Sequence, residues 1–351
     1  MATDQQTRPW AANPNARSWI APSSGESALA FHRTMPGYAA TPLVPLRDGL
    51  YVKDESDRFG LPAFKVLGAS WATNCALSAR LGLPPAPSFE ALIERTRGMD
   101  TTLVTATDGN HGRALAWIAR QLGLPARVYV AAGLPGSTIQ AMVAEGAEVI
   151  ATGRIYDDAV RMAAQSGGVL IQDTAWAGYE DVPHWIVAGY KTLFAEIDEL
   201  LEPGLVVVPT GVGSLLQAAI EHYRADGARP AVLAVEPVTA ACVTASLTAG
   251  EPVSGDTSAP TIMAGLNCGT VSSLAWPAVR DGLDVAVAVT DDETRAAMRE
   301  LHAAGLLAGP CGAAALAGLH AAPFESTGNV VLISTEGAAA NAAGEPVDQA
   351  R

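Results

Sequence analysis

The stretch TTLVTATDGNHGRALAWIARQLGLPARVYVA, residues 101–131, decides the fold class of this chain. It opens on a short run rich in β-branched residues, passes through the polar loop TDGNHG into a helical pattern, and closes on a second apolar run. A strand, a helix and a second strand in this order predict a β-α-β unit whose two strands run parallel. We expect strands at 101–106 and 127–131, with a helix at 113–122 between them.

The same alternation of strands and helices continues towards the end of the chain. Short apolar runs predict further strands at 148–151, 169–172, 205–208, 231–236, 285–290 and 330–334. Helical patterns predict helices at 138–145, 156–165, 183–201, 214–225 and 291–304. The chain is therefore expected to be an α/β protein with open parallel sheets that helices cover on both faces.

Composition excludes several classes of protein. The 351 residues include 22 Lys and Arg against 36 Asp and Glu, a formal net charge of −14, which argues against nucleic acid or an anionic membrane as the main partner. A hydrophobic content of 49% excludes intrinsic disorder. No run approaches the roughly 18 apolar residues of a transmembrane helix, and the first thirty residues contain no apolar segment of signal-peptide length. We therefore expect a cytoplasmic protein.

The cysteines do not indicate a metal site. Cys75, Cys242, Cys268 and Cys311 form neither a CxxC pair nor a cluster with histidine. In the cytoplasm they are expected to be reduced, and burial as small apolar side chains is their simplest role. The sequence leaves open whether Cys242 and Cys268 pair.

Lysine is rare, which limits the candidates for amine chemistry to Lys53, Lys65 and Lys191. Lys65 lies in the apolar stretch AFKVL, residues 63–67, at the predicted start of a helix. Apolar surroundings lower the pKa of an amine and suit it to Schiff-base formation. The alternative for Lys65 is a surface lysine whose stem lies along apolar neighbours. Lys53 is predicted to be solvated or salt-bridged, and Lys191 to lie on a helix surface.

The loop TDGNHG, residues 107–112, joins a predicted strand to a predicted helix. Its backbone N–H groups lie at a helix N-terminus, which suits a carboxylate or a phosphate. Asn110 can donate to a ligand oxygen, and His111 can support the loop. Asp108 is unfavourable beside an anion unless the ligand also carries positive charge; the alternative is an ordinary helix cap or turn residue.

Two further segments follow apolar strands. PTGVGS, residues 209–214, combines glycines with the start of a helix and can bind a phosphate, although a generic tight turn explains this segment alone better. In LISTEG, residues 332–337, Ser334 or Thr335 can face a ligand or cap the strand end. Asp173 also follows a predicted strand, where ligand-facing residues of open α/β sheets gather.

The order of these segments resembles the fold type II pyridoxal-phosphate enzymes, the tryptophan synthase β-like group. Within that group, the sequences of these segments are similar to the diaminopropionate ammonia-lyase family. The TDGNHG and DTAW segments are the ones specific to that family. The similar segments are FHRTMPGYAATPLVPL (31–46), VKDESDRFGLPAFKVLGAS (52–70), TATDGNHGRALAW (105–117), QDTAWAGYEDVPHWIVAGY (172–190), TIMAGLNCG (261–269) and LISTEG (332–337). In GPCGAAALAG, residues 309–318, the sequence departs from this family. Cys311 stands where its members tend to have an acidic residue or a serine in a similar Gly-rich turn.

The resemblance implies a role for each matching residue. Lys65 would carry pyridoxal 5'-phosphate as a Schiff base, and Asn110 would donate to its phenolic oxygen. Ser334, or else Thr335, would face its pyridine nitrogen. The residues that would cradle its phosphate are Gly211, Val212, Gly213 and Ser214. The loop that would seat the substrate carboxylate contains Thr107, Asp108, Gly109, Asn110 and His111.

The implied reaction is α,β-elimination of ammonia from 2,3-diaminopropionate, which gives aminoacrylate and then pyruvate with a second ammonia. Asp108 and Asp173 would pair with the second ammonium of this substrate, and either can transfer protons. Lys65, or Asp108 for the opposite enantiomer, would remove the α-proton. The alternatives are a β-replacement synthase or a serine/threonine dehydratase with the same cofactor, and a silent binding module, which would need no amine.

The resemblance also implies a domain organisation. Residues 1–69 and 153–351 would form a large cofactor-binding domain, and residues 70–152 a small domain that closes over the substrate. The active site would lie in the cleft between them. A homodimer that acts on a small amino acid is expected.

Overall fold

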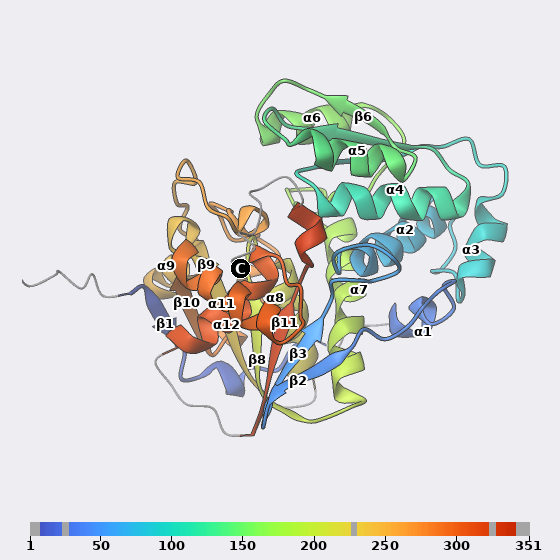
Figure 1. Cartoon of the computed structure of the whole chain (residues 1–351). Coiled ribbons are helices and arrows are strands. Elements are labelled where there is room, and N and C mark those ends of the chain that lie inside the picture. Colours follow the sequence, from blue (N-terminus) through green and yellow to red (C-terminus); the bar gives the residue numbers. More distant parts are fainter. Residues whose placement is uncertain (1–7, 23–27, 226–229, 323–327, 342–351) are drawn as a thin grey trace, which may run out of the picture. The chain divides into compact units, whose positions relative to one another are not determined.

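The computed structural model describes residues 8–22, 28–225, 230–322 and 328–341. The chain divides into two compact units, each built around one sheet (Figure 1). Unit 1 consists of residues 1–24, 42–54 and 194–335, and unit 2 of residues 25–41, 55–193 and 336–351. The predicted small domain, 70–152, lies wholly within unit 2, and its boundaries stay a prediction.

Unit 1 contains a seven-stranded sheet in the order β1-β10-β9-β8-β11-β3-β2. The five inner strands run parallel, and four of them, all except β3, coincide with predicted strands. The two outermost strands are antiparallel to their neighbours. At one edge, β2 and β3 form a hairpin across Asp48 and Gly49, and a hairpin forces antiparallel pairing. The strands are β1 (Trp10–Ala12), β2 (Leu43–Arg47), β3 (Leu50–Asp54), β8 (Pro203–Pro209), β9 (Ala231–Pro237), β10 (Val285–Val289) and β11 (Asn329–Ser334).

The core of unit 1 lies along its inner strands. Residues 205–208 of β8 are completely buried without alternation, as expected of a parallel strand covered on both faces. The Ala-rich helix α12 approaches β9 closely, because Gly318 has no side chain to keep it from Val235. The helices of this unit are α8 (Ser214–Tyr223), α9 (Cys242–Ala249), α10 (Trp276–Gly282), α11 (Asp291–Ala303) and α12 (Pro310–Ala321).

Unit 2 contains a four-stranded sheet in the order β6-β5-β4-β7, with every pair parallel. Its strands are β4 (Leu103–Thr107), β5 (Ala126–Val130), β6 (Glu148–Ala151) and β7 (Val169–Leu170). The helices that connect them are α4 (Asn110–Leu122), α5 (Gly136–Ala144) and α6 (Tyr156–Gln165). The β-α-β unit predicted from residues 101–131 is confirmed.

Further helices of unit 2 set the position of the lysine. These are α1 (Ala28–His32), α2 (Val66–Arg80), α3 (Phe89–Thr96) and the first part of α7 (Asp181–Asp198), followed late in the chain by the 3-10 helix η4 (Ala338–Asn341). α2 and α7 cross where each has a glycine. A Cβ on Gly68 would lie 2.5 Å from the Tyr190 ring, and a Cβ on Gly189 would press on the Leu67 carbonyl oxygen. This close crossing brings Tyr190 to the start of α2, where Lys65 lies.

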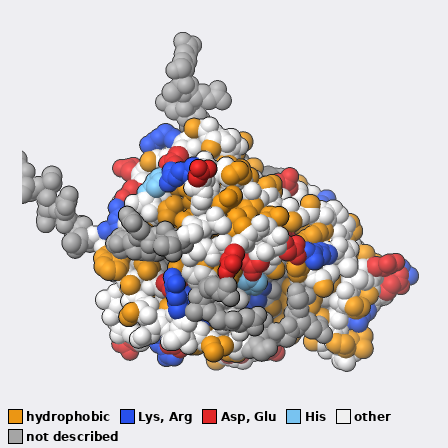
Figure 2. Space-filling model, turned by 90° about the horizontal axis from the view of Figure 1, so that it is seen from below, with side chains coloured by type: hydrophobic (Ala, Val, Ile, Leu, Met, Phe, Trp, Pro, Cys, Tyr) orange, Lys and Arg blue, Asp and Glu red, His pale blue; other side chains and the backbone are white. Residues whose placement is uncertain are grey.

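The surface carries both signs of charge. On the face in Figure 2, acidic and basic side chains occur among hydrophobic ones. A surface of mixed sign keeps the local electrostatic field small. Within the described residues, no helix combines the length and apolar character that crossing a bilayer requires.

Candidate active site

Lys65 caps the N-terminus of α2 and reaches a carboxylate far along the chain. Its Nζ lies 3.1 Å from Asp173 Oδ2 and 5.7 and 6.0 Å from the ring centroids of Phe64 and Tyr190. The Lys65 side chain is 29% exposed, so Lys65 is only partly buried. Unit 2 thus brings together two residues that the sequence singled out separately.

The electrostatics of Lys65 differ from the prediction. Burial lowers the pKa of its ammonium, but the phenol of Tyr190 and the carboxylates of Asp173 and Asp108 outweigh burial, so the pKa is raised. The apolar stretch 63–67 predicted a lowered pKa, and that prediction is wrong for the side chain as the structure places it. The reason is Asp173, whose proximity to Lys65 depends on tertiary structure.

Asp108 and Asp173 have opposite pKa shifts. Burial raises the pKa of Asp173, but the Lys65 ammonium and the His111 imidazole lower it to about 2. Burial and the Asp173 carboxylate raise the pKa of Asp108, and Lys65 offsets this only in part. Neighbouring carboxyl groups whose pKa values diverge are suited to different roles in acid–base chemistry.

The loop after β4 presents its backbone as predicted. Thr107 Oγ1 accepts from the N–H groups of Gly109 (3.0 Å) and Gly112 (3.2 Å), which folds the loop against the start of α4. Gly109 has φ +157° and ψ −96°, a combination that L side chains rarely adopt. The N–H groups at the start of a helix suit a carboxylate.

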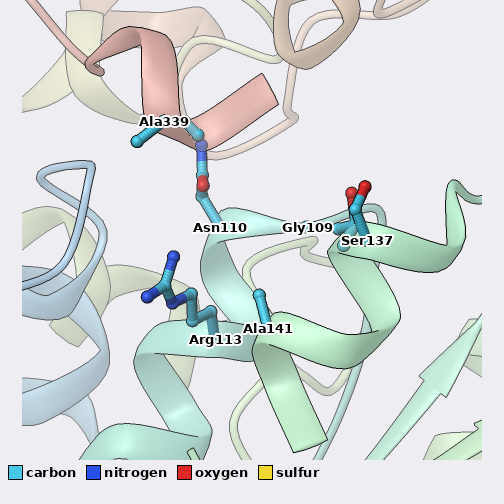
Figure 3. Close-up of a pocket in the computed structure, with 8 residues that line it drawn as sticks. Gly109, Asn110, Arg113, Ser137, Ala141 and Ala339 are labelled. Carbon is cyan, nitrogen blue, oxygen red and sulfur yellow. The ribbon is translucent and has the colours of Figure 1, made fainter. Parts of the chain in front are cut away.

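Asn110 and His111 begin α4 and have defined partners. Asn110 Nδ2 donates to Glu336 Oε2 at 2.9 Å, and its side chain points towards the segment that carries Ala339 (Figure 3). His111 Nε2 lies 2.8 Å from the Ile171 carbonyl oxygen, which requires the proton on Nε2. Its buried Nδ1 has no partner among the described residues.

A small cavity of about 100 Å³ opens beside this loop (Figure 3). It is lined by Gly109, Asn110 and Arg113 of the loop and α4, by Ser137, Thr138 and Ala141 of α5, and by Ala339 and Ala340 of η4. The segment that carries η4 is tied to the residues before Lys65, since Gly337 N donates to the Pro62 carbonyl oxygen at 3.0 Å.

The remaining predicted site residues belong to unit 1. In the loop between β8 and α8, Gly213 has φ +102°, and a Cβ on Gly211 would lie 3.0 Å from Cys268 Sγ, so this loop requires both glycines. Val212 lies between them, and Ser214 begins α8, whose N-terminal N–H groups suit a phosphate. Ser334 and Thr335, at the end of β11, are 2% and 5% exposed.

The hydroxyl groups of Ser334 and Thr335, at the end of β11, show whether the residues of this unit fit pyridoxal phosphate. Both hydroxyls are buried and have no hydrogen-bond partner within the described residues. A buried hydroxyl without a partner costs free energy, and the pyridine nitrogen is an acceptor that would satisfy one of them. Together with the glycine loop at the start of α8 in the same unit, these hydroxyl groups fit the cofactor.

For Lys53, the structure decides between two predicted environments. For other side chains near the site, the sequence offered no prediction. Lys53 is completely buried and pairs with Glu196 at 2.6 Å, so the salt-bridge alternative is confirmed and the solvated one is wrong. Tyr190 and Glu336 were not singled out, although both lie in segments quoted for the resemblance. Gln172 was missed because a glutamine at a strand end carries no signal of its own.

Among the described residues, neither a disulfide bond nor a metal-binding cluster accompanies the site. The four cysteines, including Cys242 and Cys268, form no disulfide bond with one another. Among the residues that the structure describes, no group of three or more His, Cys, Asp or Glu side chains is arranged to hold a metal ion.

Comparison with known proteins identifies relatives over most of the chain. The pyridoxal-phosphate dependent enzyme family matches residues 34–336. The diaminopropionate ammonia-lyase of Salmonella typhimurium is 41% identical over 295 residues, covering 76% of this chain and 72% of that protein. The enzyme of the same name from Escherichia coli K12 is 38% identical over 300 residues, covering 80% and 75%.

A solved structure agrees with these relatives. The crystal structure of the Escherichia coli diaminopropionate ammonia lyase in complex with an aminoacrylate–PLP azomethine reaction intermediate superposes with a TM-score of 0.81 at 31% identity, covering 94% of each chain. The fold and sequence relationships therefore extend over the same region. The chain belongs to the diaminopropionate ammonia-lyase family of fold type II pyridoxal-phosphate enzymes.

Proposed function

We propose that this protein is a pyridoxal-phosphate-dependent lyase that eliminates ammonia from 2,3-diaminopropionate. The elimination releases one ammonia and aminoacrylate. Water then converts the aminoacrylate to pyruvate and a second ammonia. The observation that carries the proposal is the pair of interacting carboxyl groups beside Lys65, of which Asp108 is exposed and Asp173 is partly buried. The names of the relatives support the same substrate.

The two carboxyl groups favour a substrate with a second ammonium over one with a hydroxyl. A partly buried carboxylate such as that of Asp173 binds an ammonium through short, charge-assisted hydrogen bonds, whereas the hydroxyl of serine or threonine cannot neutralise it. Asp173, with its pKa lowered to about 2, remains ionised at neutral pH and is suited to hold the β-ammonium. A dehydratase would gain little from this charge.

The cofactor would be held by the residues that the sequence singled out, each in its proposed role. Lys65 would bind it through Nζ, Asn110 would donate to its phenolic oxygen, and Ser334 or Thr335 would face its ring nitrogen. Its phosphate would be bound by Gly211, Val212, Gly213 and Ser214. Pyridoxal phosphate, when bound, withdraws electrons from the α-carbon of an amino acid.

The side chains of this protein would move the protons. The α-proton would pass to Lys65 Nζ or, for the opposite enantiomer, to an Asp108 carboxylate oxygen. The electron pair it leaves would form the carbon–carbon double bond as the β-carbon–nitrogen bond breaks, so the β-ammonium departs as neutral ammonia. The raised pKa of Asp108 suits it to both accept and return a proton. Thr107, Gly109 and His111 would hold the loop that seats the substrate carboxylate.

Three further expectations stand as proposals. We propose that the active form is a homodimer, that it works in the cytoplasm, and that residues 70–152 move as the small domain. Light scattering of the purified protein, with and without cofactor, tests the first of these directly. A single-chain mass would contradict it.

A panel of amino acids tests the proposed reaction. The protein, loaded with pyridoxal phosphate, is given each enantiomer of 2,3-diaminopropionate, serine or threonine, and keto-acid formation is followed. We expect at least one enantiomer of diaminopropionate to have the highest kcat/KM. A higher kcat/KM for serine or threonine would establish a dehydratase, and consumption of substrate only with an added nucleophile would establish a replacement enzyme.

A further inference from the structure

Gln172 is completely buried between the two strands that lead to the acidic pair. Its Oε1 accepts from the Ala106 N–H (2.8 Å) and from Thr105 Oγ1 (3.0 Å). Its Nε2 donates to the Tyr156 hydroxyl (3.1 Å) and to Asp173 Oδ1 (3.3 Å). A backbone N–H can only donate, so the bond from Ala106 fixes which end of the amide is the oxygen.

These bonds continue the sheet beyond the point where its backbone ladder stops. β4 pairs with β7 through Leu103 with Val169 and Val104 with Leu170, and Ile171 N then donates to the Val104 carbonyl oxygen. One residue further, the Gln172 side chain spans from β7 to Ala106. The amide therefore joins the end of the strand before Asp108 to the end of the strand before Asp173.

The backbone of Gln172 is held as firmly as its side chain. Its N–H donates to the Tyr179 hydroxyl at 2.9 Å, and that hydroxyl donates to the Leu170 carbonyl oxygen at 2.8 Å. The Tyr179 ring stacks on Trp176, with ring centroids 4.3 Å apart. Hydrogen bonds therefore hold both the backbone and the side chain of Gln172, the residue directly before Asp173.

The Asp173 carboxylate is oriented by a different partner on each oxygen. Oδ2 pairs with Lys65 Nζ, and Oδ1 accepts from Gln172 Nε2. The other titratable groups that act on it are Asp108, His111 and the phenols of Tyr156, Tyr179 and Tyr190. The Gln172 amide is neutral, so it holds Oδ1 of Asp173 without neutralising the carboxylate. The negative charge of Asp173 therefore stays available to pair with an ammonium.

We propose that Gln172 is a positioning residue that sets the orientation of Asp173 and its separation from Asp108. It acts through these carboxyl groups and does not touch the reacting atoms. This inference rests on the proposed function, in which the two carboxyl groups handle the β-ammonium and the protons.

Gln172→Glu is the informative variant. It keeps an oxygen for the Ala106 N–H and nearly the same volume, but it replaces the donor to Asp173 by a second carboxylate. We expect kcat for diaminopropionate to fall about 10- to 100-fold, because a displaced reacting group commonly costs this much. The acid limb of the kcat/KM profile should move to higher pH, because a like charge raises the pKa of Asp173. Pyridoxal-phosphate binding should change less than twofold.

Gln217→Leu is the matched control. Gln217 is a buried glutamine of α8 in unit 1, 2% exposed, whose Nε2 donates to Glu221 at 2.8 Å. It should leave the pH profile unchanged, whatever its effect on melting temperature. Gln172→Asn, a neutral and shorter amide, serves if the glutamate variant does not fold. It should lower kcat without moving the acid limb upwards.

The outcomes separate this inference from the proposed function. If folded Gln172→Glu retains the wild-type kcat and acid limb, the positioning role is wrong. If the wild-type protein makes no ammonia from diaminopropionate, the proposed function fails, and a crystal structure of the variant still decides the positioning role. An Asp173 carboxylate rotated away from its wild-type orientation supports positioning, and an unchanged one overturns it.

Discussion

Lys65 and Asp173 illustrate how one long-range contact alters the chemistry of a residue. From the sequence alone, the apolar neighbours of Lys65 indicated an amine that loses its proton easily. In the structure the Asp173 carboxylate lies 3.1 Å from its Nζ and favours the ammonium. In the proposed reaction, a substrate that brings its own ammonium to Asp173 would compete for this carboxylate and release the amine. Substrate charge and lysine reactivity are then coupled.

Asp173→Asn tests this coupling at the scale of one residue. The amide has nearly the same shape but cannot neutralise an ammonium. We expect KM for diaminopropionate to rise about 10- to 100-fold, the equivalent of about 1.5–3 kcal/mol for hydrogen bonds to a charged group. KM for serine, which has no β-ammonium, should change far less. Steady-state kinetics with both substrates measure the difference, and equal effects on the two would contradict the role of Asp173.

At the scale of single elements, the crossing of α2 and α7 places Tyr190 beside Lys65. Gly189→Ala adds a Cβ that presses on the Leu67 carbonyl oxygen. We expect a loss of about 1–3 kcal/mol in unfolding free energy, as for other over-packed sites. Gly136→Ala, where a Cβ would meet nothing within 4 Å, is the control. Urea denaturation measures both, and equal stability of the two variants would show that the helices separate without cost.

The start of α9 in unit 1 should make stability depend on pH. Burial raises the pKa of Glu236 to about 7 from its usual 4.5, although the N–H groups of Val243 and Thr244 and the Thr244 hydroxyl donate to it. The folded state therefore binds a proton that the unfolded state has lost between these values, so this residue makes stability fall as pH rises from about 4.5 to about 7.

Glu236→Gln should remove this contribution. Melting temperatures from pH 5 to pH 8 should decline less for the variant than for the wild type, because glutamine does not titrate. Glu251→Gln, at an exposed position just after α9, is the control and should follow the wild type. A variant that declines as steeply as the wild type would show that Glu236 does not cause the slope.

Elements with a strong local pattern were predictable, and others were not. β6 and α6 match their predicted ranges, 148–151 and 156–165, because a short apolar run marks the strand and amphipathic spacing marks the helix. α12 was missed because its Ala- and Gly-rich sequence is apolar on every side and has no stripe to detect. The edge strands β1 and β2 were missed because they are short and only partly buried.

At the scale of the whole molecule, the sequence located the pieces of the site better than their contacts. Lys65, the 107–112 loop and Asp173 were each found from local context, and unit 2 brings them together. The bond between Asn110 and Glu336 joins residues far apart in the chain, and no local pattern encodes it. The same applies to the four hydrogen bonds of the Gln172 side chain, which depend on how β4 and β7 diverge.

Product stoichiometry distinguishes the proposed elimination from the alternative reactions. The protein, loaded with pyridoxal phosphate, is incubated with 2,3-diaminopropionate, and ammonia and pyruvate are measured in the same samples, with Lys65→Ala as the inactive control. We predict twice as much ammonia as pyruvate throughout the reaction, because both nitrogens of the substrate are released. Equal amounts of ammonia and pyruvate, or ammonia without pyruvate, would rule out this elimination.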